Sequence, residues 1–378
     1  MHKILLPVCL LIHLCVFSQY KLRIELSVPL SSEKDSIFMA GNFNNWQPGN
    51  NAFSFSKNDK LIFEQSGLPK GMYEYKFTRG TWDKVETNGD GEDIKNRVLH
   101  LTSDTTIQHY IEGWKDNYKT KPPLLSSNVE FLQISTLKSK LKKDCEVWIY
   151  LPPGYKTSSK RYPVFYMHDG QNLFDATTSG MSEWGVDEIL DSLIKSGKQA
   201  SIIVGINNGI ARMNEHNPYN FESTGDGIGA EYIDFIVNEL KPYIDKRYKT
   251  LSSKENTIIA GSSRGGLISY HAALIYPSVF GKAGIFSPSF SLAPSIFQLT
   301  DSLAPRSKGM FFFYKGEKEG DPMMNDIKKI IAKLGETSNA LIYTVYDPEG
   351  KHNNEAWGKW FSEFYLRATS NGLNHIIR

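Results

Sequence analysis

Hydrophobic and polar positions alternate in two different ways along this chain of 378 residues. From residue 20 to about residue 110, short apolar stretches are separated by turns rich in Asn, Gly and Pro, and no helical period is present. Short strands between closely spaced turns are typical of a small antiparallel β-sandwich. The predicted strands are Leu22–Val28, Ser36–Ala40, Leu61–Gln65, Met72–Thr78 and Arg97–Leu101.

Beyond about residue 127, apolar segments alternate with amphipathic ones. One helical stripe is formed by Ile233, Ile236, Val237, Leu240 and Ile244. Alternating strands and helices predict an α/β domain with a mostly parallel central sheet and helices on both sides. We expect its strands to be buried on both faces. They are predicted at Val164–Met167, Ser201–Ile206, Thr257–Ala260, Gly309–Tyr314 and Leu341–Tyr346.

The change of pattern predicts two domains. A β-sandwich is expected over residues 19–113 and an α/β domain over residues 129–378, joined by a linker over residues 114–128. The linker contains Lys121-Pro122-Pro123. Consecutive prolines lack backbone N–H groups and resist regular structure, which supports a boundary here.

The first 18 residues differ from both domains. Lys3 precedes the apolar run Ile4–Phe17, and Ser18 ends it. This arrangement is typical of a signal peptide, with cleavage expected between Ser18 and Gln19. The run is shorter than the ~20 residues needed to cross a bilayer. We therefore expect a secreted or periplasmic protein without stable membrane insertion, with a retained anchor as the alternative.

Charge and cysteine content narrow the function classes. The chain has 43 Lys and Arg against 41 Asp and Glu, a formal net charge of +2. With so small a net charge, the protein has no strong positive electrostatic field that would attract a polyanion. We therefore expect no nucleic-acid partner. Removal of the leader leaves Cys145 as the single cysteine. Its alternating apolar surroundings predict a buried strand position rather than a catalytic thiol.

One segment of the α/β domain carries a catalytic motif. The predicted strand Thr257–Ala260 continues into the G-x-S-x-G motif of residues 261–265, and a helical stretch follows from Leu267 to Tyr276. This motif at a strand-to-helix turn is typical of a serine nucleophile, because only small flanking residues allow so sharp a turn. Ser263 is therefore the candidate nucleophile, and a chance glycine-serine turn is the alternative.

A serine nucleophile needs a base and an acid, which are expected in the order serine, acid, histidine. His352 follows the last predicted strand and precedes the final helical segment, so it is the candidate base. The acid is expected in the loop after Gly309–Tyr314, which contains Glu317, Glu319 and Asp321. Glu319 is the first candidate and Asp321 the alternative.

Two backbone N–H groups are needed to stabilise a tetrahedral oxyanion. One is expected from Arg264, the residue after the nucleophile, and the other from the loop after Val164–Met167. That loop has the sequence HDGQN over residues 168–172. Gly170 allows the backbone to approach a substrate, and the N–H of Gln171 is the candidate donor.

Three segments together resemble a known esterase family: YMHDGQNLF at 166–174, AGSSRGGL at 260–267 and HNNEAW at 352–357. From Val129 to Ala368 the chain resembles the group that includes feruloyl and acetyl xylan esterases, enterochelin esterases and S-formylglutathione hydrolase. The resemblance implies an α/β-hydrolase fold and ester hydrolysis without a metal or organic cofactor. It also implies that Arg212 lines the substrate site, with a loop salt bridge as the alternative.

The chain departs from this family next to the nucleophile. The family usually has an apolar residue there, whereas this chain has Arg264. A cation beside the oxyanion hole either selects an anionic substrate or points into solvent.

The N-terminal domain resembles the early-set sandwich modules that bind glycogen or starch. The segments AGNFNNW at 40–46 and YEYKFTRGTW at 73–82 carry the resemblance. In such modules two tryptophans stack on sugar rings, while a lysine and an asparagine bond to hydroxyls. The resemblance implies a glucan or other polysaccharide site at Trp46, Lys76, Trp82 and Asn96. A structural spacer is the alternative.

Together these features predict an exported serine esterase that acts through an acyl-enzyme on Ser263. The expected substrate is an acyl ester on a plant polysaccharide or oligosaccharide, with a feruloyl or acetyl group. Three alternatives stay open: a siderophore trilactone esterase, an acyltransferase that uses the same triad, and a non-catalytic glycan-binding protein.

Overall fold

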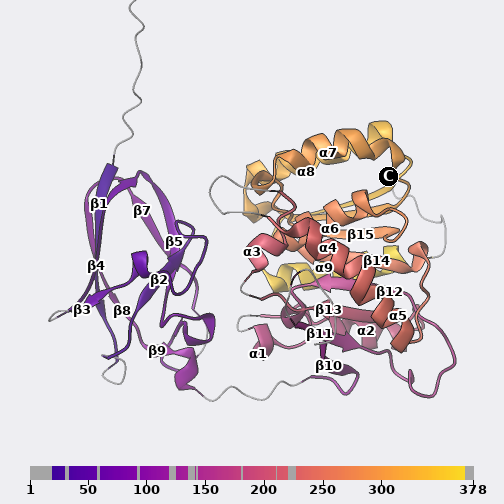
Figure 1. The fold of residues 1–378 in the computed structure, drawn as a ribbon, viewed down its shortest axis with the longest axis horizontal. Coiled ribbons are helices and arrows are strands. Elements are labelled where there is room, and N and C mark those ends of the chain that lie inside the picture. Colours follow the sequence, from indigo (N-terminus) through magenta and orange to yellow (C-terminus); the bar gives the residue numbers. More distant parts are fainter. Residues whose placement is uncertain are drawn as a thin grey trace, which may run out of the picture. The chain divides into compact units, whose positions relative to one another are not determined.

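In the computed structural model the chain divides into two compact units, Met1–Thr120 and Lys121–Arg378 (Figure 1). The structure describes residues 19–29, 34–57, 60–91, 94–118, 125–134, 141, 144–179, 182–209, 211–219 and 227–370. The predicted signal peptide and Lys121-Pro122-Pro123 lie outside the described residues. The division itself falls within the predicted linker, residues 114–128.

The N-terminal unit is built from two main sheets and a short strand pair. The first sheet has the order β3 (Ser56–Lys57), β4 (Leu61–Pro69), β1 (Gln19–Ser27) and β8 (Thr105–Tyr110). The second has the order β2 (Phe38–Gly41), β5 (Gly71–Thr78) and β7 (Arg97–Leu101). The short pair consists of β6 (Glu86–Thr87) and β9 (Gly113–Trp114). β9 includes Trp114 and belongs to the N-terminal unit. This unit therefore extends past residue 113, where the predicted β-sandwich ends.

The prediction of a purely antiparallel sandwich is wrong at one strand pair. β1 and β8 run parallel, with Leu22 opposite Thr105 and Ser27 opposite Tyr110. The strand before β8 in the chain is β7, which belongs to the other sheet. The chain therefore passes from the second sheet to the first between β7 and β8. There β8 lies beside β1 and runs in the same direction.

Alternate residues along the strands fill the space between the two sheets. Leu22, Ile24 and Leu26 of β1 are all buried, as are Tyr75 and Phe77 of β5. A strand directs successive side chains to opposite faces, so one set from each sheet forms this core. The N-terminal core is thus built from the strands of two facing sheets, as expected for a sandwich.

The described residues of the C-terminal unit form one sheet of eight strands, mostly parallel, as the sequence predicts. Their order is β10 (Val129–Ile134), β11 (Cys145–Tyr150), β13 (Ile202–Ile206), β12 (Val164–His168), β14 (Thr257–Ser262), β15 (Lys282–Phe286), β16 (Met310–Gly316) and β17 (Leu341–Asp347). β11 is antiparallel to both β10 and β13, and the remaining pairs are parallel. Cys145 is buried in β11, which confirms its predicted strand position.

Helices cover both faces of this sheet (Figure 1). One face packs against α2 (Val186–Lys195) and α9 (Asn354–Thr369). The other packs against α4 (Gly229–Phe235), α5 (Lys241–Arg247), α6 (Arg264–Ile275), α7 (Ser295–Leu303) and α8 (Asp321–Thr337). The π-helical turn η6 (Ile236–Leu240) joins α4 to α5, so the predicted helical stripe forms one continuous helical segment. Two shorter helices are α1 (Ala176–Ser179) and α3 (Arg212–Glu215).

The central strands supply side chains to both helical layers. In β12, Val164 and Tyr166 belong to one apolar cluster, while Phe165 and Met167 belong to the other. This double burial explains why such strands are apolar throughout. The prediction of burial on both faces is wrong for β17, where Leu341 is 48% exposed. β17 is the last strand of the sheet, so one of its edges has no neighbouring strand.

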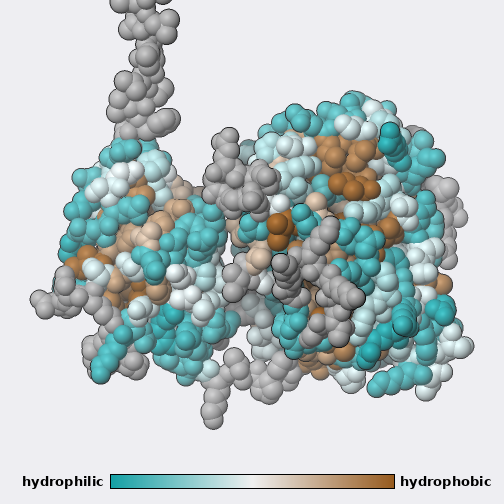
Figure 2. Space-filling model, in the orientation of Figure 1, coloured by the Kyte–Doolittle hydropathy of each residue, from teal (hydrophilic) through white to brown (hydrophobic). Residues whose placement is uncertain are grey.

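On the side of the molecule seen in Figure 2, hydrophilic side chains cover much of both units and apolar side chains form separate patches. Among the helices of the described residues, none is both long and apolar enough to span a bilayer.

Candidate active site

The G-x-S-x-G segment forms a strained turn between β14 and α6. Ser263 has φ 56° and ψ −119°, a conformation that a residue with a side chain rarely adopts. A Cβ atom at Gly261 would lie 2.9 Å from the carbonyl carbon of Gly265, so only glycine fits there. The Ser263 N–H donates to the carbonyl of Phe286 at 2.8 Å, which ties the turn to β15. The predicted strand-to-helix turn is therefore present.

Four neighbouring parallel strands place the candidate catalytic side chains at one end of the sheet, beyond the carboxyl ends of the strands. β14, β15, β16 and β17 are consecutive, and their carboxyl ends meet at this edge. One polar side chain follows each strand end, in the order Ser263, Ser287, Glu319 and His352. The loops after these strands thus assemble residues that lie far apart in the sequence.

Glu319 and His352 form the central pair of this edge. His352 Nδ1 lies 2.6 Å from Glu319 Oε2. The Glu319 side chain is 1% exposed, whereas that of His352 is 40% exposed. The His352 ring also meets the indole of Trp357 edge-on, with centroids 5.0 Å apart. One ring nitrogen is thus fixed by a buried carboxylate while the imidazole stays accessible.

The second oxygen of Glu319 accepts two further hydrogen bonds. The Ser287 hydroxyl donates to Oε1 at 2.7 Å, and the backbone N–H of Gly316 donates at 2.7 Å. Burial raises the pKa of Glu319, but the hydrogen bonds and the charge of His352 outweigh it, so the pKa lies below its ordinary value. Trp357 Nε1 donates to the Ser287 hydroxyl at 2.8 Å and holds this serine in place. The carboxylate is therefore ionised at neutral pH and fully engaged.

Sequence reasoning missed Ser287 because the strand before it, β15, was not predicted. The signal that could have found it is the short apolar run KAGIF, which ends directly before Ser287. Ser287 also has a positive φ of 44°, a backbone strain that no sequence pattern marks.

The alternative acid lies outside this network. Asp321 is exposed in the first turn of α8. Among the described residues, the carboxylate that pairs with His352 is that of Glu319. No hydrogen bond or ion pair of these residues joins His352 to Asp321.

The Ser263 hydroxyl forms its hydrogen bond with another serine rather than with His352. Its Oγ lies 3.1 Å from Ser289 Oγ, and among the described residues no hydrogen bond joins it to the imidazole. Catalytic hydrogen bonds are often long in unliganded enzymes and tighten when substrate binds. Ser289 is a second residue that sequence reasoning did not single out.

The predicted oxyanion loop packs against the nucleophile turn. A Cβ atom at Gly265 would lie 3.2 Å from His168 Cβ and 3.4 Å from Asp169 Oδ2, so Gly265 packs closely against these two side chains. Asp169 has a left-handed φ of 57° and leads into the turn that contains Gly170 and Gln171. A Cβ atom at Gly170 would lie 2.4 Å from a backbone carbon of the neighbouring strand β13. Glycine is thus required where the loop crosses β13.

An ion pair shapes this loop. Arg212 donates through Nε and a terminal nitrogen to the two oxygens of Asp169, both at 2.7 Å, and Asn208 also donates to Asp169. Burial raises the pKa of Asp169, but the charge and hydrogen bonds of Arg212 reverse the effect and hold it well below its usual range. The structure therefore contains the loop salt bridge, and substrate contact by Arg212 stays a prediction.

Arg264 does not point into solvent. Its residue is only 8% exposed, and its guanidinium donates to the Met213 carbonyl at 3.5 Å. Burial, with the nearby charge of Arg212, lowers its pKa to about 10. The solvent alternative is therefore wrong, because α6 starts in the interior of the unit and α3 lies against it.

The predicted sugar site of the N-terminal unit contains an aromatic pair. The rings of Trp46 and Trp82 have centroids 6.3 Å apart and an interplanar angle of 38°. Trp82 is 42% exposed. Asn96 is exposed and donates to Glu74 at 3.3 Å, whereas Lys76 is 5% exposed. The two tryptophans are thus adjacent, and Lys76 lies beneath the surface.

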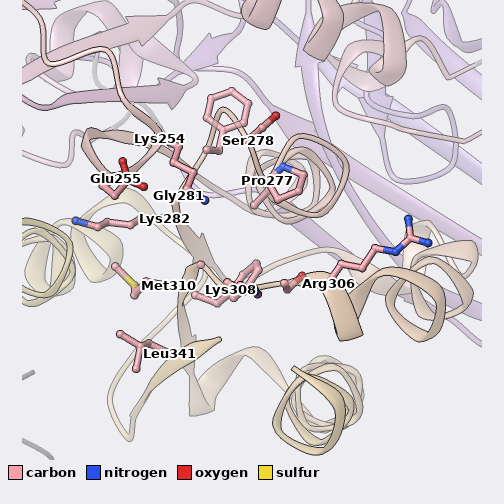
Figure 3. Close-up of a pocket in the computed structure, with 15 residues that line it drawn as sticks. Lys254, Glu255, Pro277, Ser278, Gly281, Lys282, Arg306, Lys308, Met310 and Leu341 are labelled. Carbon is pink, nitrogen blue, oxygen red and sulfur yellow. The ribbon is translucent and has the colours of Figure 1, made fainter. Parts of the chain in front are cut away.

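One pocket of the described residues lies at the opposite end of the strands of the large sheet (Figure 3). It has a volume of about 510 Å³, and its lining includes Lys282, Met310 and Leu341, which begin β15, β16 and β17. Ser263 and His352 follow carboxyl ends of strands, so they lie at the opposite edge. This pocket is not part of the candidate active site. No three His, Cys, Asp or Glu side chains of the described residues are arranged as metal ligands.

The fold and the arrangement of strand ends are those of α/β enzymes that work at the carboxyl edge of their sheet. Residues 138–370 match the model of the family described as "Putative esterase", and the chain belongs to this Esterase family. The structure is thus that of an Esterase-family hydrolase with an additional N-terminal β unit.

The proteins and structures that resemble this chain include feruloyl and enterobactin esterases. It is 28% identical over 198 residues to an endo-1,4-beta-xylanase/feruloyl esterase of Xylanibacter ruminicola, covering 51% of this chain but 26% of that protein. The match to a solved ferulic acid esterase structure covers 64% of this chain and 97% of that structure's chain, with 18% identity and a TM-score of 0.51. The enterobactin esterase FES from Shigella flexneri covers 89% of this chain and 88% of its own, with 14% identity and a TM-score of 0.53.

Proposed function

We propose that this protein is a serine carboxylic ester hydrolase whose triad is Ser263, His352 and Glu319. The observation that carries the proposal is the 2.6 Å contact between the buried Glu319 carboxylate and the accessible His352 imidazole. Glu319 and His352 follow the carboxyl ends of β16 and β17, and the strained turn at Ser263 follows the carboxyl end of β14 in the same sheet. The family of the chain supports the reaction class.

The mechanism follows from the protons that each group can hold. Glu319 accepts a hydrogen bond from the Nδ1–H of His352, which leaves the other ring nitrogen as an acceptor for the Ser263 proton. Ser263 Oγ attacks the ester carbonyl, and the protonated imidazole then donates to the departing alcohol. The resulting acyl-enzyme is hydrolysed by a water molecule that His352 deprotonates.

Two backbone amides complete the proposed machinery. The tetrahedral intermediate carries a negative oxygen, which needs donors fixed before the reaction starts. The N–H groups of Arg264 and Gln171 are the candidates. The close packing of Gly265 against the side chains of His168 and Asp169 supports this pairing, because it shows that the two segments are neighbours.

The substrate is proposed to be an acyl ester on a plant polysaccharide or oligosaccharide, with a feruloyl or acetyl group. The xylanase/feruloyl esterase relative and the ferulic acid esterase neighbour support this class. The adjacent rings of Trp46 and Trp82, of which Trp82 is exposed, support a glucan or other polysaccharide partner for the N-terminal unit. Such a substrate also fits a secreted or periplasmic protein with a cleaved signal peptide at residues 1–18.

A siderophore trilactone is the second candidate substrate. The observation that favours it is the extent of the structural match, because the enterobactin esterase covers 89% of this chain, against 64% for the ferulic acid esterase. Acyl transfer to a sugar alcohol would use the same triad, and product analysis with a competing alcohol separates it from hydrolysis.

The test is turnover of a p-nitrophenyl acyl ester by the wild type and by the Ser263→Ala variant. The proposal requires that the variant lose turnover while keeping the wild-type thermal unfolding midpoint. Near wild-type rates in the variant would refute the nucleophile, and an inactive wild type would favour a non-catalytic glycan-binding protein. Feruloylated xylan, acetylated xylan and a catecholate siderophore trilactone, assayed side by side, then identify the substrate.

A further inference from the structure

A buried arginine lies next to the proposed nucleophile without a carboxylate partner. Arg264 is 8% exposed and begins α6, one residue after Ser263. Its guanidinium donates a hydrogen bond to the Met213 carbonyl at 3.5 Å, and a bond of this length is weak for an N–H donor. No Asp or Glu among the described residues forms an ion pair with it. Its charge is therefore buried and uncompensated within the described part of the chain.

The neighbouring carboxylate is already engaged. Arg212 takes both oxygens of Asp169, so this acid is not available to Arg264. Burial and the charge of Arg212 lower the pKa of Arg264 to about 10, so its guanidinium is still protonated at neutral pH. A buried charge without a partner costs free energy, and an anion bound beside it offsets this cost.

We propose that Arg264 binds a carboxylate of the ester substrate. A guanidinium presents a planar fork that pairs with carboxylate oxygens, and such pairs are strong when water is excluded. This inference rests on the proposed esterase function and narrows its substrates to esters with a negative charge close to the scissile carbonyl. On a glycan, that charge belongs to a uronic acid beside the acylated sugar; on the acyl side, it belongs to a dicarboxylic acyl group.

Matched esters test the alcohol side. 4-Acetoxybenzoate and 4-acetoxybenzamide share the same acetyl ester and differ in a carboxylate against a neutral amide. We expect the ratio of their kcat/KM values, anionic over neutral, to fall about tenfold or more in Arg264→Met, as for loss of a charged hydrogen bond. Arg264→Lys keeps the charge and should retain part of the ratio. Using the ratio cancels any general loss of rate from a disturbed Arg264 amide.

A second pair tests the acyl side. The mono-4-nitrophenyl ester of adipic acid is compared with the 4-nitrophenyl ester of adipamic acid, after subtraction of spontaneous hydrolysis. A tenfold fall in either ratio supports the proposal and identifies the side that carries the anion. Changes below about threefold in both pairs overturn it. Arg306→Met, which removes an exposed cation at the other edge of the sheet, is the control for net charge and should leave both ratios unchanged.

Binding separates this inference from the proposed function. The amide analogues 4-acetamidobenzoate and 4-acetamidobenzamide are titrated calorimetrically into Ser263→Ala protein with and without Arg264→Met. Preferred binding of the anion that disappears with Arg264→Met supports the site even if the wild type hydrolyses no ester. Equal affinity for both analogues, together with unchanged kinetic ratios, overturns it.

Discussion

The carboxylate of Glu319 lies 2.6 Å from Nδ1 of His352, although 33 residues separate the two in the chain. α8 and β17 occupy the sequence between them, and the loops that follow β16 and β17 bring the side chains together. A buried carboxylate that faces an exposed imidazole fixes one tautomer of the ring. This relationship makes the sharpest predictions about the reaction.

The choice of acid is tested by Glu319→Gln and Asp321→Asn. In Glu319→Gln the amide no longer holds the imidazole in the required tautomer, so kcat should fall roughly a thousandfold or more. Asp321→Asn alters an exposed carboxylate without contact to His352 and should stay within about threefold of wild type. The assay is hydrolysis of a p-nitrophenyl acyl ester. A crippled Asp321→Asn beside an active Glu319→Gln reverses the assignment.

The lowered pKa of Glu319 makes a prediction about stability against pH. Because the folded-state pKa lies below the ordinary value of 4.5, ionised Glu319 stabilises the fold above that value. This contribution is lost as the pH falls through the folded pKa. Urea unfolding should therefore show Glu319→Gln less stable than wild type by about 1–3 kcal/mol at pH 7, with the difference shrinking below pH 4.5. A constant difference across this range would contradict the assignment.

Ser287 is predicted to be a positioning residue for Glu319. Its hydroxyl donates to Glu319 Oε1 and accepts from Trp357 Nε1, so Ser287→Ala releases one side of the carboxylate. We expect kcat to fall about tenfold with KM little changed, because the serine holds the acid rather than the substrate. Ser302→Ala is the matched control, since its hydroxyl donates to the Gln298 carbonyl on the exposed side of α7. A rise in KM at constant kcat would instead place Ser287 against the substrate.

The packing between the nucleophile turn and the oxyanion loop is tested at Gly265. A methyl group there would press on His168 Cβ at 3.2 Å and on the Asp169 carboxylate at 3.4 Å. Gly265→Ala should therefore lower kcat and destabilise the fold by about 1–3 kcal/mol. Gly335→Ala lies in α8 with no atom within 4 Å of the new Cβ and should stabilise by about 0.5–1 kcal/mol. Wild-type kcat in Gly265→Ala would show that the two segments tolerate displacement.

Sugar binding by the N-terminal unit is tested at Trp82. If Trp46 and Trp82 stack on sugar rings, Trp82→Ala should weaken binding to a soluble glucan about tenfold, with unchanged ester hydrolysis on a small substrate. Tyr110→Ala removes a 60% exposed aromatic ring from the same unit and should leave binding intact. Affinity electrophoresis in glucan-containing gels provides the measurement. Equal retardation of Trp82→Ala and wild type would favour the spacer.

Local features of the chain predicted most of the architecture. The short strands between closely spaced turns in the N-terminal region and the strand-helix alternation after it identified both fold classes, because both patterns arise from local backbone and burial preferences. The turn at Ser263 was predictable for the same reason, since the steric demand of a sharp turn falls on Gly261 and Gly265 in the motif itself. β15 escaped because its run KAGIF is short and contains Gly284, where a Cβ atom would lie 2.5 Å from Phe364.

The sequence by itself thus determined many of the elements, the fold class and the position of the G-x-S-x-G turn. Tertiary structure decided which residues meet: the parallel pairing of β1 with β8, the contact of Glu319 rather than Asp321 with His352, the support from Ser287, and the burial of Arg264. Periodicity and turn chemistry act over a few neighbouring residues. Partner choice and burial depend instead on packing between segments distant in the chain, which no local pattern encodes.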